Sequence, residues 1–151
     1  MKTSATALLT VLTLTGCARL HDVGMGMISS PASAHALVHG ELLSGTMVLS
    51  TDRSGALDLA SEGDPALRCM GKLRYTATQS GVIHLQCGDG TQAVLSFNAL
   101  SETRGFGSAV SARGPIHLVY GMEPEQAGAY LPLPPGKRIP PTPSSPRPEP
   151  Q

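Results

Sequence analysis

Short apolar runs alternate with turn-forming residues along most of the middle of this chain. Eight segments show the pattern: 36–43, 45–50, 56–60, 66–76, 81–87, 91–99, 103–111 and 116–120. Within 81–87 the residues Ile83, Leu85 and Cys87 share one face of a strand, and more polar residues alternate with them. Strands spaced about 8–12 residues apart predict an all-β domain built as a small antiparallel meander.

Two architectures fit this pattern of about eight strands. A closed barrel would remove exposed sheet edges, and short glycine-rich strands tolerate the curvature that closure needs. An open sandwich has the same periodicity, so the pattern does not choose between them. Asp89-Gly90 predicts a tight turn, and Gly105 and Gly107 predict a bend or bulge in their strand.

The residues after the last predicted strand change character. Residues 122–131 predict one short helix, with Pro124 in its first turn. Tyr130 and Leu131 are positioned to plug one end of a barrel. Residues 132–151 contain nine prolines in twenty positions, which predicts a disordered or polyproline-type tail.

The first sixteen residues have the parts of an export signal. Lys2 supplies a positive start, and residues 5–14 form an apolar stretch of about ten residues. A transmembrane helix needs about 20 residues, so this stretch is too short to span a membrane. Leu14-Thr15-Gly16-Cys17 then has the form of a lipobox, namely an aliphatic residue, two small residues and a cysteine.

This start resembles the signal of bacterial lipoproteins. The resemblance implies cleavage before Cys17, a diacylglyceryl thioether on its sulfur and acylation of the new N-terminus. Several acyl chains on one residue anchor a protein stably. Ala18, which stands where aspartate would retain a lipoprotein in the inner membrane, implies the outer membrane and a domain facing the periplasm. We therefore expect a signal peptide (1–16), a lipidated tether (17–35), a β domain (36–131) and the Pro-rich tail (132–151).

Cys69 and Cys87 are the other two cysteines, and an oxidising compartment favours a disulfide between them. A bond requires a hairpin loop of about five residues, 76–80, centred near Thr78. A loop centred on Ser80 would leave Cys69 about four residues out of register, and the bridge would then need a bulge. Both registers are compatible with the sequence.

Composition excludes several functional classes. Formal net charge is zero, so no basic field favours nucleic acid. The chain has two Phe, three Tyr and no Trp, which disfavours a stacking platform for bases or sugars. Nucleophile-elbow, zincin and Walker motifs are absent from the sequence. We expect no enzyme activity and no cofactor.

Three groups of polar residues are candidate metal or ionic sites. His35 and His39 lie four residues apart, the spacing of paired metal ligands on a helix, but a third ligand is lacking, which favours two half-exposed histidines at a strand start. Residues Asp58, Glu62 and Asp64 suit a solvated loop better than a cation site. Glu102 and Arg104 are expected to form a surface ion pair along one strand.

His84 and His117 fall in different predicted strands. Neither can be assigned a serine or an acid as partner from sequence, so a structural or surface role is favoured for both.

A second resemblance covers about 50 residues. It rests on Cys69-Met70-Gly71, Cys87-Gly88-Asp89-Gly90, Thr103-Arg104-Gly105-Phe106-Gly107 and the final Gly114–Gly121 segment. The pattern is similar to one in small uncharacterised bacterial lipoproteins, although His117 and Val119 stand where aromatic residues would be common. It implies a small β domain and no particular activity.

Three functions follow as hypotheses. The first is a non-enzymatic outer-membrane lipoprotein that acts structurally or by contact with an envelope protein. The second is a periplasmic inhibitor or ligand-binding module, similar to the small barrels that inhibit lysozyme, with 101–108 as the binding stretch. The third is a mobile-element exclusion lipoprotein.

Overall fold

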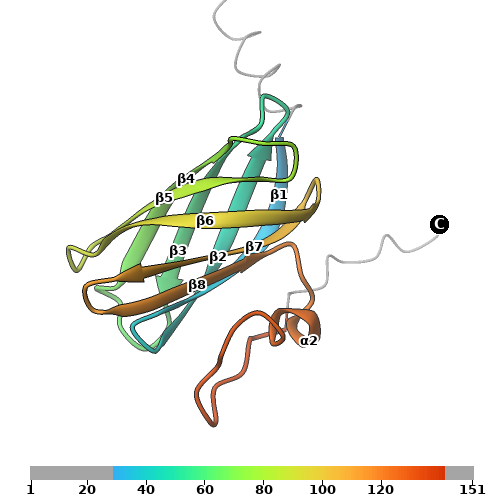
Figure 1. Ribbon diagram of the computed structural model, residues 1–151. Coiled ribbons are helices and arrows are strands. Elements are labelled where there is room, and N and C mark those ends of the chain that lie inside the picture. Colours follow the sequence, from blue (N-terminus) through green and yellow to red (C-terminus); the bar gives the residue numbers. More distant parts are fainter. Residues whose placement is uncertain (1–28, 142–151) are drawn as a thin grey trace, which may run out of the picture.

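The computed structural model describes residues 29–141, which form an eight-stranded antiparallel barrel (Figure 1). The strands are β1 (Ser29–Val38), β2 (Glu41–Ser50), β3 (Ser54–Ser61), β4 (Arg68–Tyr75), β5 (Ser80–Cys87), β6 (Gln92–Ser101), β7 (Arg104–Ser111) and β8 (Gly114–Tyr120). One short helix, α2 (Pro124–Ala127), follows them. The all-β class, the strand number and the single short helix predicted from sequence are therefore confirmed.

Pairing between the first and last strands closes the sheet. Each strand pairs with its neighbour in sequence, and β1 pairs with both β2 and β8. Ala34 is opposite Tyr120, and Val38 is opposite Ile116. This pairing removes the free edges that a sandwich would have, so it decides the question that periodicity left open.

The first predicted strand, 36–43, contains the end of β1, a tight turn and the start of β2. His39 and Gly40 have φ of 52° and 81°, which are the left-handed values of a two-residue hairpin turn. Histidine is one of the residues enriched in that region, and glycine adopts it freely. β1 begins at Ser29, so residues 29–35, predicted as part of the tether, belong to the barrel.

Alternation along every strand fills the barrel with apolar side chains. The interior includes Leu43, Met47, Leu59, Leu95 and Phe97, all nearly inaccessible to solvent. Eight strands leave an interior that side chains can fill. The barrel is therefore a packed core over most of its length.

Gly105 and Gly107 make room for aromatic rings instead of bending their own strand. The irregularity lies on β6, between Ala99 and Ser101. A Cβ on Gly107 would lie 3.1 Å from the Cβ of Phe97, and one on Gly105 would lie 2.4 Å from the hydroxyl of Tyr120. The bulge expected from sequence is thus present in this hairpin but on the partner strand.

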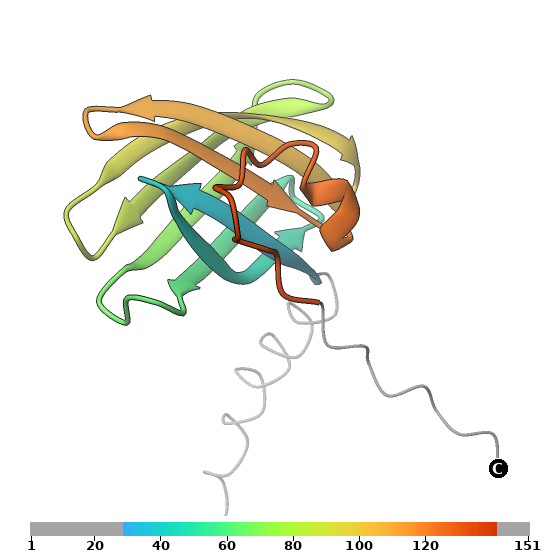
Figure 2. The ribbon, with the colours of Figure 1, turned by 90° about the horizontal axis from the view of Figure 1, so that it is seen from below.

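Residues 121–139, here called the C-terminal strap, pack on the outside of the barrel (Figures 1 and 2). Met122, Ala127, Leu131 and Ile139 are buried in a second cluster against outward-facing residues of the sheet. Those sheet residues are Leu37, Leu42, Phe106 and Val119. A long apolar stripe on the outer face of the barrel is thereby removed from water.

The strap corrects two predictions. Leu131 is buried against the outer face, and Tyr130 stacks on Phe106 with ring centroids 4.5 Å apart, so neither plugs the barrel. The β domain also continues past 131, because Leu133 packs against the cluster and Ile139 is 8% exposed. Apolar residues between the prolines give this part of the tail a face to bury.

Polar contacts hold the strap at several points. The backbone N–H of Gly121 donates to the carbonyl of Ser33 at 2.8 Å. Lys137 Nζ donates to the carbonyl of Gly40 at 3.2 Å and pairs with Glu41 Oε2 at 2.9 Å. The Lys137 ammonium, followed by the Ser61 hydroxyl, lowers the pKa of Glu41. The strap is therefore fixed to β1 as well as to the β1–β2 turn.

The predicted signal peptide, the lipidation site Cys17 and residues 142–151 of the Pro-rich tail lie outside the described residues. Among residues 29–141, no helix combines the length and apolar character required to cross a membrane.

Candidate functional site at the barrel mouth

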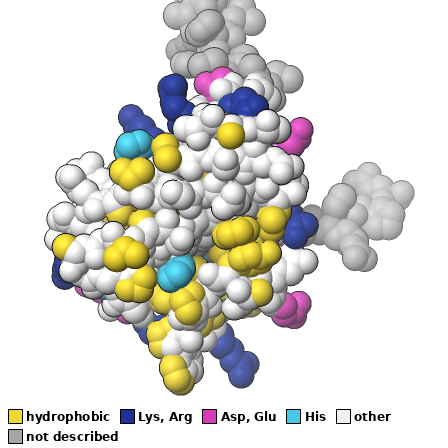
Figure 3. Space-filling model, viewed as in Figure 1, with side chains coloured by type: hydrophobic (Ala, Val, Ile, Leu, Met, Phe, Trp, Pro, Cys, Tyr) yellow, Lys and Arg dark blue, Asp and Glu magenta, His cyan; other side chains and the backbone are white. Residues whose placement is uncertain are grey.

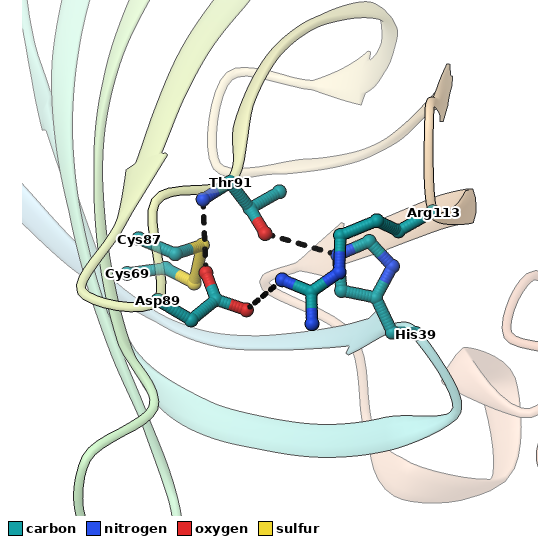
Figure 4. Close-up of a disulfide and its surroundings, with 6 residues drawn as sticks. All are labelled: His39, Cys69, Cys87, Asp89, Thr91 and Arg113. Atoms are coloured by element: carbon teal, nitrogen blue, oxygen red, sulfur yellow. Dashed lines mark hydrogen bonds and ion pairs between the residues drawn. A yellow bond between two sulfur atoms is a disulfide. The ribbon is translucent and has the colours of Figure 1, made fainter.

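Side-chain bonds tie together the turns at one end of the barrel. Asp89 Oδ1 accepts the backbone N–H of Thr91 at 2.9 Å, and Arg113 Nη1 donates to Asp89 Oδ2 at 3.0 Å (Figure 4). His39 Nε2 and Thr91 Oγ1 share a hydrogen bond of 3.0 Å. The bonds from Thr91, the backbone one first, lower the pKa of Asp89. Three turns, β1–β2, β5–β6 and β7–β8, are thus joined.

The Cys69–Cys87 disulfide lies beside these turns (Figure 4). The two residues are directly opposite in the β4–β5 ladder, and Tyr75 is opposite Gly81. The hairpin loop is therefore 76–80, centred on Thr78, which is the register that the bond required. Both sulfurs point into the core, where Cys69 is fully buried and Cys87 is 5% exposed.

The opposite end opens into a cavity with a volume of about 520 Å³. We call it the mouth cavity. Its lining comes from the start of β1 and the β2–β3, β4–β5 and β6–β7 turns: Ser30, Leu49, Ser50, Thr51, Arg53, Ser54, Tyr75, Thr78, Gln79, Ala99, Ser101, Glu102 and Thr103. Hydroxyl and amide groups dominate this list, with a few apolar side chains among them.

Arg53 is the most constrained residue of the lining. Its φ of 66° is unusual for a side-chain-bearing residue, and its carbonyl accepts the N–H of Tyr75 at 3.2 Å. Its Nη2 donates to the carbonyls of Ala77 and, at 3.1 Å, Thr78. Its Cζ lies 4.8 Å from the centre of the Tyr75 ring. These contacts join the β2–β3 and β4–β5 turns and fix the guanidinium at the mouth.

Three aromatic rings lead from the mouth toward the core. Tyr75 meets Phe97 edge-on with centroids 5.0 Å apart, and Phe97 meets Tyr120 with centroids 6.5 Å apart. Burial and the nearby Tyr75 raise the pKa of the Tyr120 hydroxyl, so it stays protonated at physiological pH. Tyr75 lines the cavity, and its contact with Phe97 connects the cavity wall to the packed core.

No family model, curated protein or solved structure matches this chain. The site must therefore be interpreted from its own geometry.

His35 and His39 do not form a joint site. His35 lies on the outer face of β1, where Nδ1 and Ser44 Oγ are 3.0 Å apart and the residue is 6% exposed. It is therefore buried instead of half-exposed as predicted, and this burial lowers its pKa. His39 is in the next turn, bonded to Thr91.

The other polar candidates are also dispersed. Asp58 pairs with Arg68 on β4, and Asp64 Oδ1 accepts the N–H of Ala66 at 3.0 Å in its own loop. His84 and His117 occupy outward positions on β5 and β8. No group of three or more His, Cys, Asp or Glu suited to a metal ion occurs within residues 29–141.

Glu102 and Arg104 separate, contrary to the predicted surface pair. Glu102 falls in the β6–β7 turn and lines the mouth cavity. Arg104 begins β7, and its Nη2 donates to Gln126 Oε1 in the strap at 3.1 Å. The turn reverses the chain between them, so they do not lie on one side of a single strand.

Sequence reasoning missed Arg53 and Tyr75 as site residues. The turn 51–55 is visible in the sequence, but its approach to the β4–β5 loop depends on how the barrel closes. Ser101, Glu102 and Thr103 belong to the stretch 101–108 that was selected from sequence, and they do line the cavity.

A second feature is a face nearly free of charge. Strands β5, β6 and β8 contain no Asp, Glu, Lys or Arg, and β7 has only Arg104. In Figure 3 the charged groups surround this face, and apolar side chains and histidine lie within it. Val94 and Val110, which are 55% and 87% exposed, lie where the β6–β7 ladder has already ended. No occupant of this face is indicated.

Proposed function

We propose that this chain is a non-enzymatic binding protein of the bacterial cell envelope. It is held to the outer membrane through a lipid on Cys17 and faces the periplasm. The lipobox Leu14-Thr15-Gly16-Cys17 and Ala18 support this location. The barrel supports the binding role, since it offers a cavity at one end of an otherwise packed core.

The mouth cavity is the observation that carries the proposal. Its volume of about 520 Å³ falls in the range of small-molecule sites, and its hydroxyl and amide groups are accompanied by a few apolar side chains. Its described lining contains no histidine, cysteine or aspartate. Its serines and threonines thus have no imidazole base within the lining, which favours binding over covalent chemistry.

The arrangement of loops explains why this end would serve as the binding site. The disulfide end is bridged from turn to turn by Asp89, Arg113 and His39. At the mouth, Arg53 joins the β2–β3 and β4–β5 turns, and the β6–β7 turn lies on the other side of the opening. A binding site on loops held by a rigid barrel is a common arrangement.

Site-specific photo-crosslinking in cells tests the proposal. A photoreactive residue is placed at Thr78 or Ser101 on the mouth, and at Ser108 on the uncharged face or Gln86 near the disulfide end as controls. We expect a specific adduct from the mouth positions, identified by mass spectrometry. Adducts from the controls alone would show that the mouth is not the contact site.

The anchor has its own test. Cys17→Ser is expected to abolish acylation and release the chain from the membrane fraction. Retention of unacylated protein in the outer membrane would contradict lipid anchoring.

A second candidate function is inhibition of an envelope-active enzyme such as lysozyme. The observation that favours it is the place of Glu102 and Thr103 on the rim, where a turn could enter a target cleft. A lysozyme activity assay tests it, and unaltered hydrolysis at saturating protein would exclude that role.

A further inference from the structure

Arg53 and Glu102 stand on opposite sides of the mouth. Arg53 is in the β2–β3 turn and Glu102 in the β6–β7 turn. In the closed order β1 to β8, four strands separate these turns in either direction. They are the only charged residues in the described lining, and hydroxyl and amide side chains lie between them. The cavity therefore has a positive side and a negative side.

Neither charge is neutralised by an ion pair within the described structure. The ion pairs among residues 29–141 are Asp58–Arg68, Asp89–Arg113 and Glu41–Lys137. Arg53 uses Nη2 for two backbone carbonyls. A guanidinium has five N–H donors, so Nε and Nη1 each keep donors that a carboxylate oxygen can engage.

The width of the barrel sets the size of a ligand that could reach both charges. Strands about 4.8 Å apart and tilted by about 40° place opposite walls of an eight-stranded barrel about 16 Å apart. The two side chains line the cavity between these walls. An extended peptide advances about 3.3 Å per residue, so about two to four residues bridge the remaining distance.

We propose that the mouth cavity binds short peptides with free ends, the terminal carboxylate on Arg53 and the terminal ammonium at Glu102. This inference rests on the proposed binding function and adds the class of ligand. Serine and threonine hydroxyls and the Gln79 amide between the charges supply partners for peptide N–H and C=O groups. Leu49 and Ala99 provide apolar contact for small side chains.

Calorimetric titration with defined peptides tests the inference. The protein is the full mature chain carrying Cys17→Ser, and the probes are trialanine, its N-acetylated form and its C-terminal amide. We expect trialanine to bind and each blocked form to bind at least about tenfold more weakly, since each loses a charge-assisted contact.

Variants assign each end of the peptide to its residue. In Arg53→Gln, amidation is expected to have no further effect while acetylation still weakens binding. Glu102→Gln should show the reverse. Arg74→Gln and Glu62→Gln, which change exposed charges outside the cavity, should bind like the parent. If Arg53→Gln fails to fold, Arg53→Lys is used as a second variant. It keeps the positive charge, so amidation of the peptide should still weaken binding.

Two results would overturn the inference. One is affinity that is indifferent to both end modifications, and the other is no binding of any of the three peptides. If mouth crosslinks persist in cells under either result, the binding function stands and the peptide class is wrong. If the mouth crosslinks are absent as well, both proposals fail.

Discussion

The ring of Tyr120 lies over Gly105 on the neighbouring strand. The two residues are direct partners in the β7–β8 ladder, and a Cβ on Gly105 would lie 2.4 Å from the Tyr120 hydroxyl and 2.7 Å from the Asn98 carbonyl. An aromatic ring covering a strand glycine is a recognised way to stabilise curved sheets. The pair links the barrel wall to the aromatic contact between Phe97 and Tyr120 in the core.

Gly105→Ala should therefore destabilise the fold by about 2–3 kcal/mol, because the added methyl group meets both a ring and a fixed backbone carbonyl. Gly128→Ala is the matched control. Its Cβ would have no neighbour closer than 3.6 Å, and the change should stay within about 0.5 kcal/mol. Urea unfolding measures both, and equal stabilities would refute this account of Gly105.

The strap is expected to contribute to stability through its apolar contacts. Ile139→Ala, at a position 8% exposed, should lower the free energy of unfolding by about 2 kcal/mol. Val110→Ala, at a position 87% exposed, should change it by less than about 0.5 kcal/mol. Removing residues 132–151 should cost more than removing 142–151, and equal stability of the two truncations would contradict the packing of the strap.

His35 should make stability depend on pH. Its imidazole is buried on the outer face of β1, and burial lowers its pKa below the ordinary value of 6.5. The unfolded chain therefore binds a proton more readily than the folded chain. Below about pH 6.5 stability must fall with decreasing pH, until the folded-state pKa is passed.

His35→Gln is expected to flatten the dependence of the unfolding free energy on pH between about 7.5 and 5. His84→Gln, on an exposed outward position of β5, is the control and should leave the slope unchanged. A parent-like slope in His35→Gln would assign the effect to other groups.

The disulfide closes a segment with a sequence separation of 18 residues. On the chain-entropy model, the double variant Cys69→Ala, Cys87→Ala should lose about 3 kcal/mol of stability. Equilibrium unfolding of the oxidised parent and the variant measures this difference. Reduction of the parent should give a similar loss, and an unaffected midpoint would mean that the bond contributes little.

Strand positions and the fold class were predictable because alternation is a local signal. Ile83, Leu85 and Cys87 were predicted to share one face of a strand, and all three face the core. The turn at His39-Gly40 was missed because the apolar residues on both sides form one apparently continuous run. Its local signal was an X-Gly pair with histidine, a residue that tolerates left-handed values.

The site was less accessible to sequence reasoning. Glu102 was paired with Arg104 on the basis of spacing, whereas Glu102 lies in the β6–β7 turn and Arg104 begins β7, where it bonds to the strap. Arg53 and Glu102 are 49 positions apart, and only closure of the barrel places them on opposite sides of one cavity.

The sequence by itself determined most of the strands after the first turn, the turn at Asp89-Gly90 and the residues facing the core, because each depends on neighbours a few positions away. Tertiary structure decided the closure of β1 on β8, the disulfide register, the burial of His35 and the mouth cavity. Each of these depends on contacts between distant segments. Such contacts are fixed only when the whole sheet curves and all of its apolar surfaces are buried together.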